Sequence, residues 1–214
     1  MNQVKSKLQQ AYKLSKNLDR VEEYSSRWED KGAADALLIG ELTEQKNLDF
    51  VFTDPERIDS VNEIRMEGLL SDFGGIDYIL TRPNFPVMSK RMLSVLESVK
   101  DFPHQVIPVV IEDMEMAFFG SLDRSGKVNT DYVAVQLLEQ LDIFDREKSV
   151  YSPSSISLSG VGRIRKLVLK VPEEGLPPIF RIIENSTHLY VSPEAKTALE
   201  AAGITGVRFV DINF

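Results

Sequence analysis

The spacing of apolar residues at the start of the chain predicts a helix. Within residues 1–30, small or apolar side chains recur at three- and four-residue intervals, namely Val4, Leu8, Ala11, Ser15 and Leu18. The positions between them are mainly Lys, Gln, Asn, Asp and Glu. This spacing matches the 3.6-residue turn of a helix with one apolar stripe. The segment is therefore predicted to be an amphipathic helix that stops near Gly32.

Short apolar runs bounded by turn residues predict strands along the rest of the chain. The expected strands are 37–39, 50–52, 76–80, 87–88, 106–111, 164–171, 179–183, 189–191 and 207–212. Pro108 interrupts one of them, and because proline donates no backbone hydrogen bond, we expect it at an edge or a bulge. Residues 132–141 fit either a strand or a short helix, whereas the serine-rich segment 152–160 is typical of a loop.

Two further helices are marked by serine residues that are suited to capping. Ser89 precedes an apolar pattern at helical spacing that runs to Val99, and its hydroxyl is expected to accept from free N–H groups of the first turn. Ser192 followed by Pro193 predicts a second helix start. That helix is expected to reach Ala202 and to end at Gly203, which tolerates a left-handed backbone.

The two serine-capped segments share one layout. Val87-Met88-Ser89 with Leu96-Glu97 corresponds to Tyr190-Val191-Ser192 with Leu199-Glu200. We interpret this as one strand–helix–strand unit used twice; the alternative is that caps and leucines coincide by chance. Together the elements predict an α+β fold with mixed or mainly antiparallel sheets. A helical and strand segment over 1–75 and an α+β region over 76–214 are expected to form one compact domain.

Composition and charge narrow the class of partner. The chain of 214 residues has a net charge of −8. An acidic surface repels phosphate, so we expect no nucleic-acid partner and favour a basic protein, although the charge could serve solubility alone. The N-terminus lacks the apolar run of a signal peptide, and no stretch approaches the roughly 18 apolar residues of a membrane span. We therefore expect a cytoplasmic protein without a membrane partner.

The sequence contains few signs of catalytic chemistry. It has no cysteine, which excludes disulfides and thiolate zinc sites. His104 and His188 lack metal-binding spacing, and neither a Walker loop nor a GxSxG elbow occurs. We therefore predict no catalytic, cofactor-binding or metal-binding residues, and a protein that is not an enzyme.

Carboxylates cluster at one expected strand end. The densest group is Glu112-Asp113-Met114-Glu115, and Asp123 lies in a second acidic turn. Such a cluster is consistent with a solvated edge, with a contact patch for a basic partner, or with paired carboxylates that hold a divalent cation. We select Glu112, Asp113, Glu115 and Asp123 as candidate partner-binding residues.

Segments from position 76 onward carry a family resemblance. They are Val87–Val110, Leu141–Tyr151, Lys166–Leu169, Pro177–Arg181, Leu189–Ser192 and Ala202–Phe209. Their order and spacing resemble the immunity-protein family DUF1629, also called Imm11, which is encoded beside polymorphic toxins. The resemblance implies a toxin–antitoxin-like role in bacterial competition, with a toxin delivered by a contact-dependent or type VI-like secretion system. Some such toxins resemble HNH-type nucleases. Within these segments, Asp145 and Arg181 are interpreted as core-facing salt-bridge partners.

The main hypothesis is an immunity protein that binds a cognate, basic toxin and neutralises it by occlusion. One alternative is a carboxylate- and metal-dependent enzyme, which predicts that magnesium or calcium shifts the melting temperature. A second is a scaffolding module that oligomerises through residues 1–30, which predicts that deletion of this helix changes the mass in solution. The sequence leaves the oligomeric state open.

Overall fold

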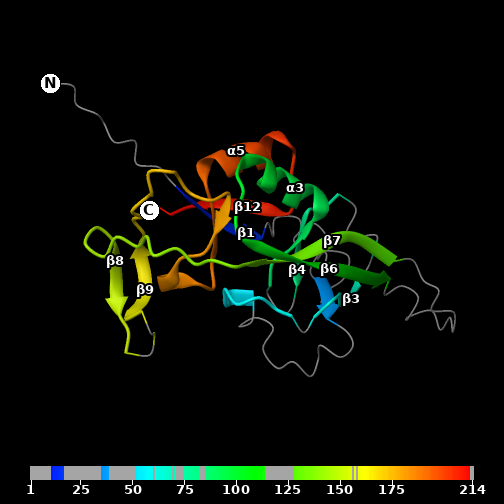
Figure 1. Cartoon of the computed structure of the whole chain (residues 1–214), viewed down its shortest axis with the longest axis horizontal. Coiled ribbons are helices and arrows are strands. Elements are labelled where there is room, and N and C mark those ends of the chain that lie inside the picture. The colour runs from blue at the N-terminus through cyan, green and yellow to red at the C-terminus, as the bar shows by residue number, and fades with distance from the viewer. Residues whose placement is uncertain are drawn as a thin grey trace, which may run out of the picture.

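The computed structural model describes residues 11–16, 35–38, 52–59, 61–68, 70, 75–81, 85–113, 128–155, 157 and 159–212. Within these residues strands predominate, and two α-helices, α3 (Lys90–Val99) and α5 (Pro193–Ala201), lie side by side on one side of the molecule (Figure 1). Strand pairing is antiparallel in most places and parallel in two. The predicted α+β class with mixed or mainly antiparallel sheets is confirmed.

A closed barrel forms one part of the fold. Its strands follow the order β2 (Asp35–Leu38), β3 (Ile64–Gly68), β6 (His104–Asp113), β7 (Val128–Leu137), β5 (Val87–Ser89) and β4 (Tyr78–Thr81). The pairs β3–β6 and β2–β4 are parallel. Alternate residues of each strand point inward, as closure requires. On β6 these are Ile107, Val109 and Ile111, which belong to the barrel core.

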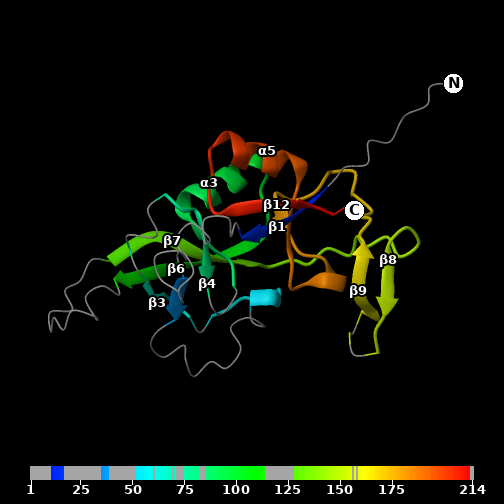
Figure 2. The same ribbon diagram turned by 180° about the vertical axis from the view of Figure 1, so that it is seen from behind.

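The second part is an antiparallel sheet. Its strands follow the order β10 (Ile179–Phe180), β11 (Leu189–Val191), β1 (Tyr12–Lys16) and β12 (Val207–Asp211). A separate hairpin of β8 (Val150–Pro153) and β9 (Val161–Lys166) stands at the end of the molecule away from the barrel (Figure 2). The 3-10 turn η3 (Ile183–Asn185) connects β10 to β11.

The predicted N-terminal helix is wrong at Tyr12–Lys16, which form β1. This strand bonds to β11 on one side and to β12 on the other. Ala11 packs below the sheet and Leu14 above it, so burial here does not follow the helical stripe. Pairing with two strands distant in sequence overrides the helical spacing of the segment. The remainder of the predicted helix lies outside the described residues.

Several strand predictions are confirmed, and others differ at their ends. Residues 132–137 are strand, which resolves the choice left open for 132–141. Pro108 pairs with Val133 of β7 but precedes the β3 pairing, which starts at Val109, so it lies at a local edge as predicted. The bulge between β6 and β7 lies beyond it, between Val109 and Ile111. The expected strand 179–183 ends at Phe180. Phe52 begins a helical turn and not a strand.

The strand expected over 164–171 instead covers Val161–Lys166. The chain leaves the hairpin after Lys166 because the next residues have other partners. Leu167 packs into the core below the sheet. The backbone of Val168 pairs with Asp145 N and with the Ser149 hydroxyl, at 2.9 Å in each case.

The twice-used unit is confirmed as β5–α3–β6 and β11–α5–β12. In each unit two parallel strands flank one antiparallel strand, which is β7 in the first and β1 in the second. The Ser89 hydroxyl accepts from Met92 N at 3.0 Å, and the Ser192 hydroxyl accepts from Ala195 N at 3.1 Å. Both serine caps are therefore confirmed.

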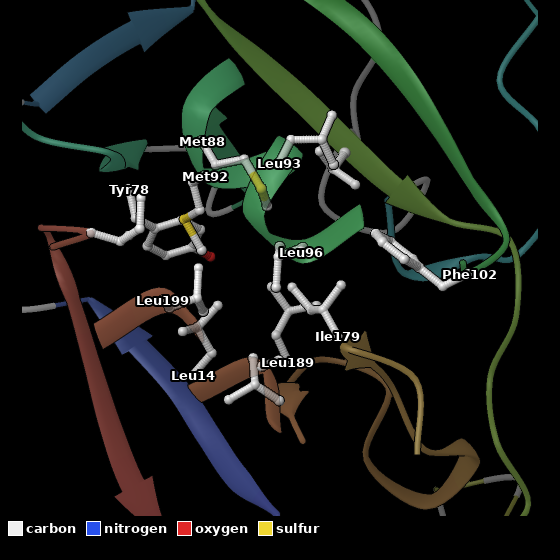
Figure 3. Packing of buried hydrophobic residues seen from close by; sticks show 14 of the residues in the cluster. Leu14, Tyr78, Met88, Met92, Leu93, Leu96, Phe102, Ile179, Leu189 and Leu199 are labelled. Carbon is white, nitrogen blue, oxygen red and sulfur yellow. The ribbon is translucent and has the colours of Figure 1, made fainter. Parts of the chain in front are cut away.

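Among the described residues the apolar core has three clusters, and the largest of these joins the two repeated units. It lies between α3, α5, the outer face of β5 and β7, and the upper face of the sheet (Figure 3). Leu96 and Leu199 are equivalent positions of the two units, and both are fully buried in it. The barrel interior and the lower face of the sheet hold the other two clusters.

Asp77 connects the barrel to the last turn of the chain. Its carboxylate accepts from the Ser89 hydroxyl at 2.6 Å, from Arg91 Nη2 at 2.5 Å and from Thr205 N at 2.9 Å. Burial by itself would raise the Asp77 pKa, but these hydrogen bonds outweigh it and hold the pKa below its usual value. The carboxylate is therefore charged at neutral pH, inside the fold.

The turn from Gly203 to Gly206, which donates to Asp77 through Thr205 N, depends on its two glycines. Gly203 has a φ of 64° after α5, which confirms the predicted helix stop. Gly206 has a φ of 79°, and a Cβ there would lie 2.5 Å from the carbonyl oxygen of Tyr78. Only glycine allows this close approach, through which Thr205 O accepts from the N–H groups of Asp77 and Tyr78.

Candidate functional site

One side of the barrel presents its outward side chains to solvent. The outer residues of β3 and β6 alternate with the buried ones, and they comprise Arg65, Glu67, Val106, Pro108, Val110 and Glu112. We call this surface the β3–β6 face. Because the two strands pair in parallel, Glu67 lies directly beside Glu112. Val106 is 41% exposed, so the face combines an apolar stripe with a charged end.

The charged end contains Glu112, one of the four predicted partner-binding residues. Glu112 accepts from Nε of Arg65 at 3.1 Å and pairs with Nη2 of the same side chain. Nη1 of Arg65 contacts Glu63 at 3.0 Å. The hydrogen bond to Glu112, with its charge, raises the Arg65 pKa. An exposed pair of this kind contributes about 0–1 kcal/mol, so Glu112 is held in place without being buried.

Asp113 follows Glu112 at the strand end, and its Oδ1 accepts from Leu70 N at 3.5 Å. The other two predicted residues, Glu115 and Asp123, lie outside the described residues. The structure adds Glu63 and Glu67 to the group. Neither residue could be selected from the sequence. Glu67 comes 45 residues before Glu112, and only the parallel pairing of β3 with β6 brings this part of the chain beside it.

A second candidate site is a pocket below the four-stranded sheet. It has a volume of about 330 Å³ and lies between β1, β9, the turn before β11 and the end of β12. Its polar lining includes Lys13, Arg163, Arg165, His188 and Asp211. Sequence reasoning selected none of these residues, because they come from four separate segments. The pocket is basic although the chain as a whole is acidic.

Positive charge dominates the pocket. Burial lowers the pKa of Lys13, whose Cα lies between those of Tyr190 and Val210 across the sheet. Burial also lowers the pKa of His188, and the charges of Lys13 and Arg181 lower it further. His188 Nδ1 lies 2.7 Å from Oδ1 of Asn185, which fixes the ring in the pocket wall. A neutral imidazole beside several cations can accept a proton when an anion enters.

Arg181 and Asp145 do not form the predicted salt bridge. Asp145 contacts Lys148 at 3.2 Å and accepts from two backbone N–H groups of its own turn. Arg181 is 4% exposed and donates to the Ser186 carbonyl, and its Nε has no partner among the described atoms. Burial lowers its pKa to about 10. The prediction failed because Asp145 is satisfied within its own turn, and Arg181 donates to the Ser186 carbonyl instead.

We predict that Lys13→Met raises the pKa of His188, because it removes a positive charge that disfavours the imidazolium. The measurement is a pH titration of the imidazole proton signals by NMR, assigned with a His104→Gln variant. Lys166→Met is the matched control, since Lys166 is exposed on β9 and outside the pocket lining. An equal response to both substitutions would show that the effect is one of net charge only.

The described residues contain no group of three or more His, Cys, Asp or Glu side chains placed to hold a metal ion. Within the same residues, every helix is too short or too polar to cross a bilayer. Comparison of the sequence with protein-family models and with curated proteins gives no match. The two sites are therefore interpreted from their own geometry.

Proposed function

We propose that the chain is an immunity-type protein that binds a basic protein toxin through the β3–β6 face and neutralises it by occlusion. The observation that carries the proposal is the parallel pairing of Glu67 with Glu112 on an exposed face, next to the apolar stripe of Val106, Pro108 and Val110. The resemblance of residues 76–214 to polymorphic-toxin immunity proteins supports the same proposed function.

The chemistry of the face suits such a partner. Protein interfaces combine a central apolar area with a polar rim. Among the described residues, three carboxylates, those of Glu63, Glu67 and Glu112, surround the one guanidinium of Arg65 at the charged end of the face. This excess of negative charge would steer a basic surface toward the stripe and raise the association rate at low salt. The stripe would then exclude water from the contact, and the bulk of the barrel would cover the toxin's substrate groove.

We predict that the double substitution Glu67→Lys and Glu112→Lys abolishes protection. The probe is the product of the gene immediately upstream, expressed with the chain in a bacterial host and also used in binding measurements over a salt series. Two charge reversals in a steered interface are expected to weaken binding by about a hundredfold or more. The affinity of the unaltered chain should fall as salt rises, because exposed charges are screened.

The matched control is the double substitution Glu173→Lys and Glu174→Lys, which makes the same charge change in an exposed turn after Lys170. This control should protect the host and bind normally. The proposal fails if the upstream product is harmless, if it does not bind the chain, or if both double variants lose binding equally. Melting curves of the two variants show that each remains folded.

A further inference from the structure

The pocket below the sheet plays no part in the proposed toxin contact, which lies on the barrel. We propose that it is a binding site for a small phosphate-bearing molecule about the size of a mononucleotide. It is lined by Lys13 of β1, Arg163 and Arg165 of β9, and His188 from the turn before β11.

The arrangement of cations favours an anion over other ligands. Of the residues that the structure describes, the pocket lining holds one lysine and two arginines against one carboxylate, that of Asp211. Within the described part of the chain, Lys13, Arg163 and Arg165 form no ion pair. An ammonium group that has lost part of its hydration without an ionic partner gains most from a bound anion. Arginines add planar donors that match phosphate oxygens in pairs.

The remainder of the lining fits an organic group attached to the phosphate. Ile164 contributes partly exposed apolar surface, and the buried side chains of Leu167, Tyr190 and Ile212 form the apolar wall behind it. The Asn185 amide donates to the Tyr190 hydroxyl at 3.0 Å, which orders both side chains. A volume of about 330 Å³ accommodates a mononucleotide and lies in the range of small-molecule sites.

The net charge of the chain favours a small phosphate ester over a nucleic acid as the ligand of this pocket. A long polyanion would also meet the acidic surface that gives the chain its net charge of −8. Binding of nucleic acid depends on replacing counterions along many phosphates, which four basic side chains in one pocket do not provide. A single phosphate group, in contrast, meets a pocket in which positive side chains outnumber the one carboxylate of Asp211. The inference therefore commits to a small phosphate ester.

The experiment is isothermal titration calorimetry of the full chain with adenosine 5′-monophosphate at constant ionic strength. Adenosine and inorganic phosphate are titrated in parallel to separate the two halves of the ligand. We expect the nucleotide to bind at least about tenfold more tightly than adenosine, because the charged hydrogen bonds carry much of the affinity. Inorganic phosphate should compete with the nucleotide. The nucleotide should also raise the pKa of His188 in an NMR titration, since an anion stabilises the imidazolium.

The double variant Arg163→Gln and Arg165→Gln is expected to weaken nucleotide binding by about tenfold or more. The control pairs Arg208→Gln with Lys166→Gln, which removes the same charge from exposed positions outside the pocket lining and should change binding less than about twofold. The inference is overturned if the nucleotide does not bind, if adenosine binds equally well, or if a single-stranded oligonucleotide binds more tightly. It is also overturned if both double variants lose affinity equally. Toxin binding is unaffected by any of these results, so the two proposals fail separately.

Discussion

Replacement of Leu96 by Ala is expected to lower the free energy of unfolding by about 3 kcal/mol, within the range of roughly 2–5 kcal/mol for buried leucines. Leu96 is fully buried between α3 and the sheet, among side chains from both repeated units. Truncation removes apolar contacts and leaves a cavity that the surrounding elements cannot easily fill. Urea denaturation followed by circular dichroism measures the loss.

The equivalent residue of the second unit gives an internal comparison. Leu199→Ala should cost a similar amount, because Leu199 has the same burial in the same cluster. The losses in the double variant should not simply add, since neighbouring cavities share a lining. Ser94→Ala, an exposed position of α3, is the control and should change stability by less than about 0.5 kcal/mol. A Leu96→Ala protein as stable as this control would mean that the cluster is not packed as described.

Asp77→Asn is expected to destabilise the protein by about 3 kcal/mol at neutral pH, because it removes a buried carboxylate that accepts several hydrogen bonds. The amide can face only some of its former donors with an oxygen. In either orientation its NH2 group would face Arg91, together with the Ser89 hydroxyl in one orientation and Thr205 N in the other. Urea denaturation at pH 7 measures this effect. Asp101→Asn, an exposed change of the same kind, is the control.

The pH dependence gives a second, sharper test of Asp77. Its folded-state pKa is lowered from a reference value of 3.8, so its stabilising effect is fully present above that value. The effect is lost as the pH falls through the lower folded-state pKa. The stability difference between the unaltered chain and Asp77→Asn should therefore shrink below about pH 4. A difference that stays constant down to pH 2 would show that the carboxylate charge plays no part.

The sequence predicted best where the signal is local. Ser89 and Ser192 were identified as caps because capping needs only neighbouring backbone groups, and Gly203 because a left-handed stop favours glycine. The repeated unit followed from those same local features. By contrast, the segment Tyr12–Lys16 has helical spacing and becomes a strand, because its partners lie near the other end of the chain.

The same contrast between local signals and long-range pairing applies to the candidate sites. Glu112 and Asp113 could be selected as candidates because an acidic run after an apolar strand is visible in the sequence. Glu67 was not, because only the parallel register of β3 and β6 brings it beside Glu112. The basic pocket was invisible for a further reason. Its cations come from separate strands, and in sequence Lys13 and Arg163 resemble any solvated charge.

The central position of β1 also sets the order in which the chain can fold. Tyr12 pairs with both Val191 and Asp211, so an early segment completes its sheet only with the latest ones. On the ribosome, β1 would keep both edges unpaired until β11 has left the exit tunnel, and its second edge until β12 has followed. Strands this distant in sequence pair slowly, because the intervening chain loses conformational entropy before the contacts between the strands can offset that loss. The barrel, whose strands end at Leu137, can close well before that moment.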